Sequence, residues 1–443
     1  MSHSPRIIRL GTKCFGPALF FCTVGGLASA ATLCVNPGGT GGCTSTIGAA
    51  VAAAMPGDTI LVGSGIYKEQ VTITQTVSLI ALNPLAPPTI DATGFSNGIF
   101  VNGIPTAPNA GLSGVVIKGF RIRNANFEGI LVANGNDTTL ADNHVFGNDK
   151  ALDPTAGACP GLPPFETNEG DDCGEGIHLM GARRSTLLHN EVDHNSGGIL
   201  ISDETGPNFS NLISGNHVHD NPWDCGITMA SHGPATSVIP AAKASFGVYR
   251  NTITNNESAD NGLGLPGAGA GVGIFAAIPG YAAYENVVIN NNIHGNGLPG
   301  VTMHNHAAFP SPLPPGNLSD NVIVGNWIHG NAADTADAAT SGPTGINIYS
   351  LVPVNGTIIS QNVFDDEAID IAFSAPDGRT YAHFNDFSAA SIGVENRGAG
   401  GAVTATENWW HCPGGPDGAS ASCATKVGKS VGSTPWLVLP FAP

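Results

Sequence analysis

The feature that most constrains this chain is a short frame, Asn-x-apolar-x-x-Asn, that returns along its length. Full copies occupy residues 143–148, 190–195, 216–221, 251–256, 291–296 and 326–331, and a partial copy opens at Asn362. Gly-Ile or Gly-Val pairs recur beside these copies and open short apolar strands. Self-similarity at a spacing of 20–50 residues is typical of solenoids, in which each repeat packs on its neighbours. The repeat therefore predicts an all-β solenoid, on which any functional site must be built.

Stacked asparagines give the frame a structural explanation. Identical amide side chains one coil apart form hydrogen-bonded ladders, and asparagine also suits tight backbone corners. We therefore assign the asparagines to the architecture and look for chemistry in the positions that vary between copies, such as Asp193-His194 in one coil and His219-Asp220 in the next.

Charge excludes one class of partner. The 443 residues carry a net charge of −18, and only 11% are charged. Nucleic-acid binding needs basic patches on the protein, so we expect no nucleic-acid partner. The same charge disfavours a polyanionic polysaccharide unless metal ions or a local basic cluster assist.

The first 30 residues read as a secretory signal peptide. Arg6, Arg9 and Lys13 precede an apolar stretch, and Ala28-Ser29-Ala30 forms a small-residue cleavage site. We expect a mature chain that begins near Ala31, is secreted or periplasmic, does not insert into a membrane and is monomeric.

Seven cysteines remain after removal of the signal peptide, and an oxidising compartment favours their pairing. The short-range scheme pairs Cys34–Cys43, Cys159–Cys173 and Cys412–Cys423 and leaves Cys225 over. A second scheme pairs Cys173 with Cys225 and leaves Cys159 unpaired. The spacing does not choose between them.

The chain divides into four parts by composition. After the signal peptide, residues 31–57 form an N-terminal cap whose alanine-rich segment 46–54 is the one convincing helix. Residues 58–411 form the solenoid and residues 412–443 a closing segment. The repeats are longer than a minimal coil, and the extra residues form Gly-, Pro- and Ala-rich insertions at 150–173, 233–243, 263–271, 309–317 and 331–343. If all five leave at one corner of the coils, they wall a groove.

Two segments carry a resemblance to a known family. "PGDTILVGSGIYKEQVTI" near the start, and "ENWWHCPGGP" with Pro435-Trp436-Leu437 near the end, resemble the entry and closure of secreted right-handed parallel β-helix proteins of the pectate-lyase-like kind. With the coil repeat, the resemblance covers most of residues 45–440. It implies a right-handed parallel β-helix of about ten coils. It does not choose a function, because the fold hosts lyases, hydrolases, epimerases, tailspikes, adhesins and periplasmic accessory proteins.

Alignment of the Gly-Ile pairs places chemically active side chains in adjacent coils. Asp203-Glu204 then falls beside Ser231-His232, with neighbouring strands about 4.7–4.9 Å apart. Asp224 opens the coil that carries His232, and His178 lies in the coil before Asp203-Glu204. We predict that the catalytic residues are Asp203, Glu204, Asp224, His232 and His178.

The turns of residues 171–232 hold further acids and an aromatic residue that simple repeat turns do not require. Trp223 could stack on a sugar ring, or it could cover a coil corner. Substrate-binding candidates are Trp223, Asp172, Glu175, Arg184 and His219. Acid–histidine pairs on adjacent coils, such as Asp193 with His219, could transfer protons or could form a solvated polar face.

Metal and cofactor signals are weak. The sequence has no His-x-x-x-His helix, no CxxC pair and no phosphate-binding glycine loop, so we predict no dedicated metal site and no organic cofactor. Calcium is the exception, because Asp171-Asp172 with Glu175 supplies oxygen ligands. His304 and His306 beside Met303 loosely suggest copper, but alternation points Met303 inward.

The favoured function is cleavage of glycosidic bonds in a polysaccharide by a carbohydrate-active protein, with the site on residues 171–232. One alternative is a non-catalytic surface, adhesion or periplasmic accessory protein. Another is a polysaccharide lyase or epimerase with His178, His217 or His219 as base and Arg183-Arg184 as neutralising cations. The first reading requires Glu204, Asp224 and His232 to converge on one cleft.

Overall fold

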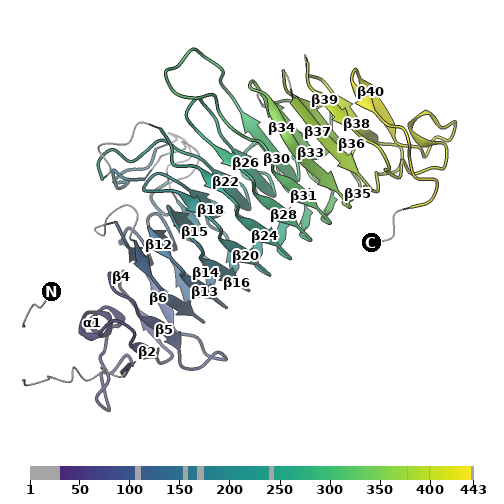
Figure 1. Ribbon diagram of the computed structural model, residues 1–443. Helices are drawn as coiled ribbons and strands as arrows, with labels where there is room; N and C mark the ends of the chain where they lie inside the picture. Colours follow the sequence, from purple (N-terminus) through teal and green to yellow (C-terminus); the bar gives the residue numbers. More distant parts are fainter. Residues whose placement is uncertain are drawn as a thin grey trace, which may run out of the picture.

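The computed structural model describes residues 30–104, 111–152, 158–166, 174–238, 244–336, 338–376, 378–398 and 400–440. The chain winds into a parallel β-helix, whose strands stack in sequence order from one end to the other (Figure 1). Each coil passes through three long parallel sheets in the order A, B, C. Sheet B has ten strands, so ten coils of the described chain have a strand in all three sheets. This confirms the predicted all-β solenoid.

Sheet A has fourteen strands: β1 (Thr32–Val35), β2 (Thr59–Val62), β5 (Ser78–Ala81), β9 (Val116–Lys118), β13 (Thr139–Ala141), β16 (Thr186–Leu188), β20 (Leu212–Ser214), β24 (Thr252–Thr254), β28 (Val287–Ile289), β31 (Val322–Val324), β34 (Val354–Ser360), β37 (Gly378–His383), β39 (Ala402–Thr404) and β41 (Val431–Gly432). Sheet B comprises β3 (Ile66–Tyr67), β6 (Thr89–Asp91), β10 (Arg121–Arg123), β14 (His144–Phe146), β17 (Glu191–Asp193), β21 (His217–His219), β25 (Glu257–Ala259), β29 (Asn292–His294), β32 (Trp327–His329) and β35 (Val363–Asp365).

Sheet C has twelve strands: β4 (Val71–Ile73), β7 (Ile99–Asn102), β11 (Ile130–Ala133), β15 (Glu175–Met180), β18 (Gly197–Ser202), β22 (Ile227–Ala230), β26 (Val272–Phe275), β30 (Val301–Asn305), β33 (Thr344–Ser350), β36 (Ile369–Ser374), β38 (Ile392–Asn396) and β40 (Thr425–Gly428). Two small sheets join β8 (Leu112–Ser113) to β12 (Gly135–Asn136), and β19 (Asn208–Phe209) to β23 (Val248–Tyr249) and β27 (Ala283–Tyr284). A 3-10 turn, η1 (Gly415–Asp417), lies in the closing segment.

The helix α1 (Ile47–Ala53) stands at the N-terminal end of the stack, as the alanine-rich segment predicts (Figure 1). Thr46 caps it by accepting a hydrogen bond from the Ala49 N–H at 3.3 Å. Its buried face, Ile47, Ala50 and Val51, joins the main core cluster. The helix therefore covers apolar side chains that the first coil would otherwise expose, as the end of a solenoid requires.

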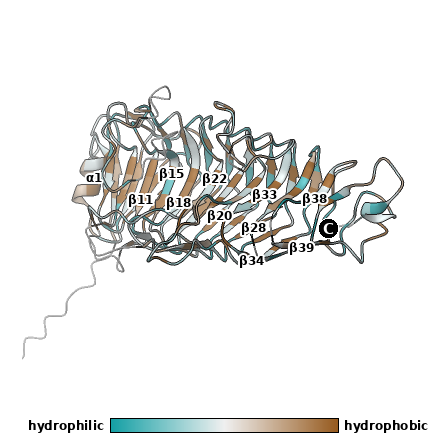
Figure 2. Cartoon of the chain, turned by 90° about the horizontal axis from the view of Figure 1, so that it is seen from above, coloured by the Kyte–Doolittle hydropathy of each residue, from teal (hydrophilic) through white to brown (hydrophobic). Residues whose placement is uncertain are grey.

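A single apolar core runs along the inside of the coils. The middle residue of a three-residue strand points inward, and registered partners stack in rows such as Val145, Val192 and Val218. Strand alternation sends the flanking residues outward. Figure 2 shows the hydrophobic strands lying side by side along the length of the helix.

The asparagines form the predicted ladders, and the described part of the chain contains three of them. One ladder follows sheet A, one follows sheet B, and a shorter one precedes sheet A. In the first, Asn291 donates from its backbone N and from Nδ2 to Oδ1 of Asn326, each at 2.9 Å. Its own Oδ1 accepts the same two bonds from Asn256. A residue with positive φ stands directly before many ladder asparagines, as His189 does before Asn190 and Gly325 before Asn326, so the chain turns sharply there.

The sequence frame assigns one copy to the wrong strand. Residues 251–256 contain β24 of sheet A, whereas the equivalent copies contain sheet B strands. The true counterpart is 256–261, where Ser258 replaces the inward apolar residue. Its hydroxyl donates to the Gly271 carbonyl at 2.7 Å, which satisfies a polar group inside the core. A pattern that demands an apolar residue skips this copy.

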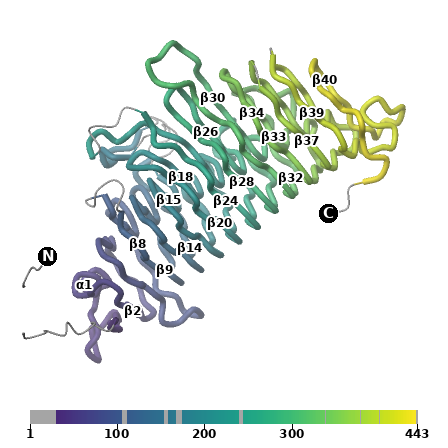
Figure 3. Tube along the Cα trace, in the orientation of Figure 1, coloured from purple at the N-terminus to yellow at the C-terminus, as the bar shows by residue number. Residues whose placement is uncertain are grey.

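The insertions leave at two corners rather than one. Those at 150–173, 263–271 and 331–343 lie between sheets B and C, and those at 233–243 and 309–317 lie between sheets C and A. Both corners border sheet C, and Figure 3 shows the loops beside β18 and β30. The outer face of sheet C is therefore flanked on both sides.

Two of the predicted disulfides, Cys34–Cys43 and Cys412–Cys423, are present. Cys225 is buried and free, which excludes its pairing with Cys173. Cys159 is disulfide-bonded, and Cys173 lies outside the described residues. The proposed signal peptide also falls outside them, apart from Ala30.

Within the described ranges, no helix has both the length and the apolar character needed to cross a membrane.

Buried carboxyl groups near the C-terminal coils predict a pH-dependent stability. Glu367 ends the ladder that follows sheet B: its Oε1 accepts both bonds from Asn331, and its Oε2 is buried without a hydrogen-bond partner among the described residues. Burial raises the pKa of Glu367 to about 8. Between the unfolded and folded pKa values the folded state holds the extra proton, so the free energy of unfolding falls as pH rises through this window.

Glu367→Gln should therefore flatten the loss of stability between about pH 5 and pH 8, by about 1.4 kcal/mol for each unit of pKa shift removed. Urea unfolding at both pH values, with Glu285→Gln as the exposed control, measures the change. Equal pH slopes in wild type and Glu367→Gln would contradict the prediction.

Candidate functional site

The outer face of sheet C carries a buried polar cluster that includes several of the predicted catalytic residues. Its inward residues, such as Ile177 and Ile199, belong to the core. Its outward residues form rows across β11, β15, β18 and β22, and the register places His178 beside Leu200 and Met180 beside Ser202. These outward side chains are buried too, because chain segments beyond the sheet cover them.

A continuous chain of hydrogen bonds crosses this face. His178 in β15 contacts Glu128 through Nδ1 at 3.0 Å and Ser202 through Nε2 at 2.6 Å. The Ser202 hydroxyl donates to Oε2 of Glu204, and Oε1 of Glu204 contacts Nδ1 of His232 at 2.6 Å. We call these five residues, Glu128, His178, Ser202, Glu204 and His232, the buried relay. The relay confirms that Glu204 and His232 are neighbours on adjacent coils.

Ser202 joins the two parts of the relay. Its one hydroxyl proton points to Glu204, and its oxygen lies 2.6 Å from Nε2 of His178. On the other side of the ring, Nδ1 of His178 lies 3.0 Å from one oxygen of Glu128. The second oxygen of Glu128 accepts the backbone N–H of Glu175 at 2.7 Å, so this carboxylate is held at both ends. The relay is therefore rigid at its inner end and reaches His232, which is 8% exposed, at its outer end.

Asp203 and Glu204 are adjacent in sequence but differ in protonation. Burial raises the pKa of Asp203 to about 7. Burial also acts to raise the pKa of Glu204, but the charges and hydrogen bonds of His232, with help from His178 and Ser202, outweigh it and lower that pKa to about 2. Glu204 is thus a carboxylate at neutral pH, and a carboxylate beside an imidazole orients the ring for proton transfer.

Asp203 positions a loop. It accepts hydrogen bonds from the backbone N–H of His232 at 2.7 Å and of Gly247 at 2.5 Å, and from the Ser231 hydroxyl at 3.3 Å. These bonds fix the beginning and end of the segment that follows β22. Asp203 therefore holds the backbone of His232 in place.

The segment 158–166 lies over the relay. Phe165 packs on the outward cluster Leu131, Ala133 and Met180, and its ring stacks on Phe100 at 6.1 Å. Both carboxylate oxygens of the next residue, Glu166, are buried and have no hydrogen-bond partner among the described residues. Burial, with the charges of Glu128 and Glu204, raises the pKa of Glu166 well above its usual value. The Glu166 carboxyl therefore holds its proton more tightly than an exposed glutamate does, and it is influenced by two carboxylates of the relay.

A pocket of about 270 Å³ adjoins the outer end of the relay. Its walls come from residues 244–247, 280–282, 284, 314–315 and 317, including Phe246, Tyr281 and Tyr284. The Tyr281 hydroxyl lies against Gly233, where a Cβ atom would come within 2.8 Å of it, and burial raises the Tyr281 pKa. Aromatic walls beside polar groups are typical of small-ligand sites.

The remaining catalytic prediction, Asp224, lies at the opposite edge of the sheet. Its Cβ stands beside Gly197, next to the side chain of Glu175, at the start of the strands. Glu204 follows the end of β18. A six-residue strand spans roughly 17–20 Å, so the predicted meeting of Asp224 with Glu204 and His232 does not occur.

The substrate-binding candidates are scattered. Glu175 contacts the relay, with its Oε2 3.9 Å from Nδ1 of His178. Trp223 is half-buried, and its ring packs against Gly264 of the loop after β25. Arg184 forms an ion pair with Asp137 at 2.9 Å, on the corner that leads to sheet A. His219 lies on sheet B, and Asp172 lies outside the described residues.

Sequence reasoning missed Glu128, Glu166, Ser202 and Tyr281. Glu128 had a usable signal, since it immediately precedes a Gly-Ile pair as Glu175 does. Glu166 had none beyond its place in the longest insertion, because an insertion does not follow the coil period.

Three side chains at the inner end of the relay lie close enough to share a metal ion. Glu128, Glu175 and His178 offer three ligand atoms within 4.8 Å of one another. Both ring nitrogens of His178 already make hydrogen bonds, and calcium prefers oxygen ligands, so this group does not match a calcium site. The acidic pair 171–172 lies outside the described residues.

The loosely suggested copper site has only part of its ligands. His306 Nε2 lies 3.2 Å from His304 Nδ1, and burial lowers the pKa of His304 to about 3. Met303 is fully buried in the apolar core, as alternation predicts, so its sulfur does not face the histidines.

Comparison with known proteins bears on the fold. A family model described as a right-handed β-helix region matches residues 96–259. The Dettilon tailspike protein superposes with a TM-score of 0.56 and 14% identity, over 85% of this chain and 62% of that chain. The DFA-IIIase of Arthrobacter chlorophenolicus A6, without its lid, gives 0.51 and 13%, over 88% of this chain and 94% of that chain.

A mannuronan C-5 epimerase A-module of Azotobacter vinelandii gives a TM-score of 0.49 and 13% identity, over 81% of this chain and 93% of that chain. No curated protein matches by sequence. At these identities the likeness concerns the fold alone. The chain is therefore a right-handed parallel β-helix protein.

Proposed function

We propose that this protein hydrolyses glycosidic bonds of a polysaccharide on the outer face of sheet C. The observation that carries the proposal is the buried relay, which ends at His232 beside an aromatic pocket and lies under Glu166, whose pKa burial raises. The coarser part, action on carbohydrate, is supported by the carbohydrate-active proteins among the similar folds. The finer part, hydrolysis of a glycosidic bond, is supported by the side chains of Glu166 and His232.

Glu166 and the relay together supply the two proton transfers that hydrolysis needs. The Glu166 carboxyl gives its proton to the leaving glycosidic oxygen as the bond to the sugar carbon breaks. His232, with Nδ1 held by Glu204, accepts a proton from the attacking water at Nε2, and the water oxygen bonds to that carbon. Paired groups whose environments push their pKa values apart are the usual source of such acid–base roles.

Charge favours hydrolysis over elimination. A lyase or epimerase acting on a uronate must neutralise the substrate's carboxylate. Here Glu128, Glu166, Glu175 and Glu204 gather around two histidines, and the whole chain carries −18. Such a site suits a neutral or weakly charged glycan.

The test uses the different leaving groups of two substrate types. Wild type should release reducing ends from a member of a polysaccharide panel, without unsaturated products that absorb in the ultraviolet. Glu166→Gln should lower kcat on the polysaccharide by about 10²- to 10⁴-fold, because the leaving oxygen loses its proton donor. The same variant should cleave aryl glycosides with good leaving groups at a rate close to wild type.

Glu285→Gln, on an exposed corner, is the matched control and should retain full activity. An equal loss of kcat on both substrate types would show that Glu166 is not the acid. Unsaturated products would show that the reaction is elimination rather than hydrolysis. If the wild-type protein binds glycans but cleaves none, the protein is a non-catalytic glycan-binding protein.

We also propose that the protein is secreted or periplasmic and acts as a monomer. The disulfides Cys34–Cys43 and Cys412–Cys423 fit an oxidising compartment. A secreted or periplasmic protein would also meet a polysaccharide substrate outside the cytoplasm.

A further inference from the structure

A second cluster of ligating side chains lies on sheet B, away from the relay. Strand β21 reads His217-Val218-His219, and Val218 is fully buried in the core. The two-residue period of a strand then places both histidines on the outer face. Their rings stack with centroids 3.9 Å apart.

Glu191 completes this group from the neighbouring coil. It lies on β17, and the register places it directly opposite His217. Glu191, His217 and His219 each offer one ligand atom, and all three atoms lie within 4.8 Å of one another. The Oε1 atom of Glu191 is 3.9 Å from Nε2 of His219. A tetrahedral zinc site with bonds of about 2.0–2.2 Å needs ligand atoms roughly 3.4 Å apart, so small side-chain rotations suffice.

His219 is already oriented for metal binding. Its Nδ1 contacts Oδ2 of Asp220 at 2.8 Å, which places the proton on Nδ1 and the lone pair on Nε2. The Nε2 atom is buried and has no hydrogen-bond partner in the described part of the chain. A carboxylate behind a ligating imidazole is the usual second-shell arrangement, and it fixes the tautomer and the ring orientation.

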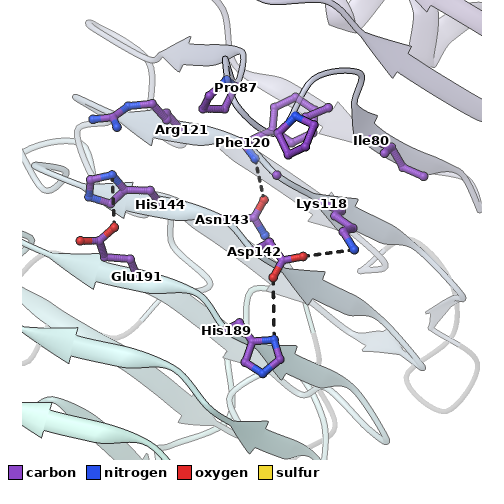
Figure 4. A pocket seen from close by; sticks show the side chains of 13 residues that line it. Ile80, Pro87, Lys118, Phe120, Arg121, Asp142, Asn143, His144, His189 and Glu191 are labelled. Atoms are coloured by element: carbon purple, nitrogen blue, oxygen red, sulfur yellow. Dashed lines mark hydrogen bonds and ion pairs between the residues drawn. The ribbon is translucent and has the colours of Figure 1, made fainter.

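Further carboxylates surround the group. Oε2 of Glu257, on β25, lies 3.4 Å from Nε2 of His217. On the other side, His144 lies 3.7 Å from Glu191, and Figure 4 shows this pair at the edge of a cavity of about 410 Å³. His144 and Asp193 also form a candidate triad with Glu191, but they bond to each other at 2.6 Å. The triad on β21 is therefore the more available of the two.

We propose that Glu191, His217 and His219 bind one Zn²⁺ ion on the outer face of sheet B. Two imidazoles and a carboxylate form a ligand set that zinc accepts, with a fourth position left for water. The ion would tie β17 to β21, two strands of neighbouring coils. The site is independent of the hydrolysis proposed on sheet C.

Titration of the untagged chain with ZnCl₂ by isothermal calorimetry tests the site. Wild type should bind one zinc per chain at this site, and Co²⁺ in its place should give the visible absorption of a tetrahedral nitrogen–oxygen site. His217→Gln and His219→Gln should each weaken zinc binding at least 100-fold. Asp220→Asn should weaken it by about 10- to 100-fold, since only the orienting carboxylate is lost.

His329→Gln is the matched control, because His329 occupies the same outward row on β32 and belongs to no candidate triad of the described residues. It should bind zinc as wild type does. Urea unfolding confirms that each variant is folded before titration. Zinc binding that is unchanged in the His217→Gln/His219→Gln double variant, or no saturable binding to wild type, would overturn the proposal.

Discussion

His232→Asn is expected to lower kcat for polysaccharide hydrolysis by about 10²- to 10⁴-fold, which is the usual contribution of a positioned general base. The asparagine amide can occupy the place of Nδ1 and donate to Glu204, so the hydrogen bond at 2.6 Å has a replacement. What the variant lacks is a nitrogen that accepts a proton from water. The loss should therefore appear in kcat, with KM little changed and the folded state retained.

The pH profile distinguishes this role from a structural one. The limb of the kcat/KM profile that reports the base should disappear in His232→Asn. In Glu204→Gln that limb should remain but move to lower pH, because the carboxylate no longer stabilises the imidazolium. His306→Asn, two coils farther along the same face, is the control. Activity of His232→Asn within twofold of wild type would show that His232 does not act as the base.

The fold was predictable because every copy of the repeat indicates the same coil structure. The asparagine frame, the Gly-Ile pairs and strand alternation each specify the same stack, and the resemblance of the two ends agreed with them. Where a coil departs from the pattern, prediction failed for a local reason. Ser258 satisfies its hydroxyl through the Gly271 carbonyl, so a polar residue occupies a core position that the pattern reserves for an apolar one.

The candidate site was predictable only where it follows the coil period. Glu204 and His232 occupy equal offsets after neighbouring sheet C strands, so alignment of the coils places them together. Asp224 comes before its strand and Glu204 after its own, so they lie at opposite edges of the sheet even though their coils are adjacent. Glu166 reaches the site from an insertion, whose path depends on tertiary contacts such as Phe165 on Met180.

The His-x-His pair on β21 shows a different limit. The sequence displays it plainly, and the stacking predicted that Asp193 and His219 are neighbours, which the register confirms. The ligand atoms that gather are those of His217, His219 and Glu191, and the Glu191 side chain comes from the preceding coil. The strand register shows which residues are backbone neighbours. The length and conformation of each side chain determine which of these neighbours it contacts.

Asn291→Ala is expected to reduce the free energy of unfolding by about 2–4 kcal/mol, the range for stranding buried hydrogen-bonding groups. The substitution removes the acceptor for both the backbone N–H and Nδ2 of Asn256. It also removes the donor to Oδ1 of Asn326 and to the Ile253 carbonyl. Water cannot replace these bonds easily, because the amide is only 3% exposed.

Urea unfolding measures the loss, and Asn355→Ala is the control, since Asn355 is an exposed strand residue whose replacement should change stability by less than about 0.5 kcal/mol. Because a solenoid is stabilised by contacts between neighbouring coils, a break in the ladder in mid-stack should also broaden the transition as the two halves uncouple. Equal midpoints for the two variants would mean that the apolar core alone holds the coils in register. A lower midpoint for Asn291→Ala alone would show that the amide ladder, repeated from coil to coil, contributes stability that the core does not replace.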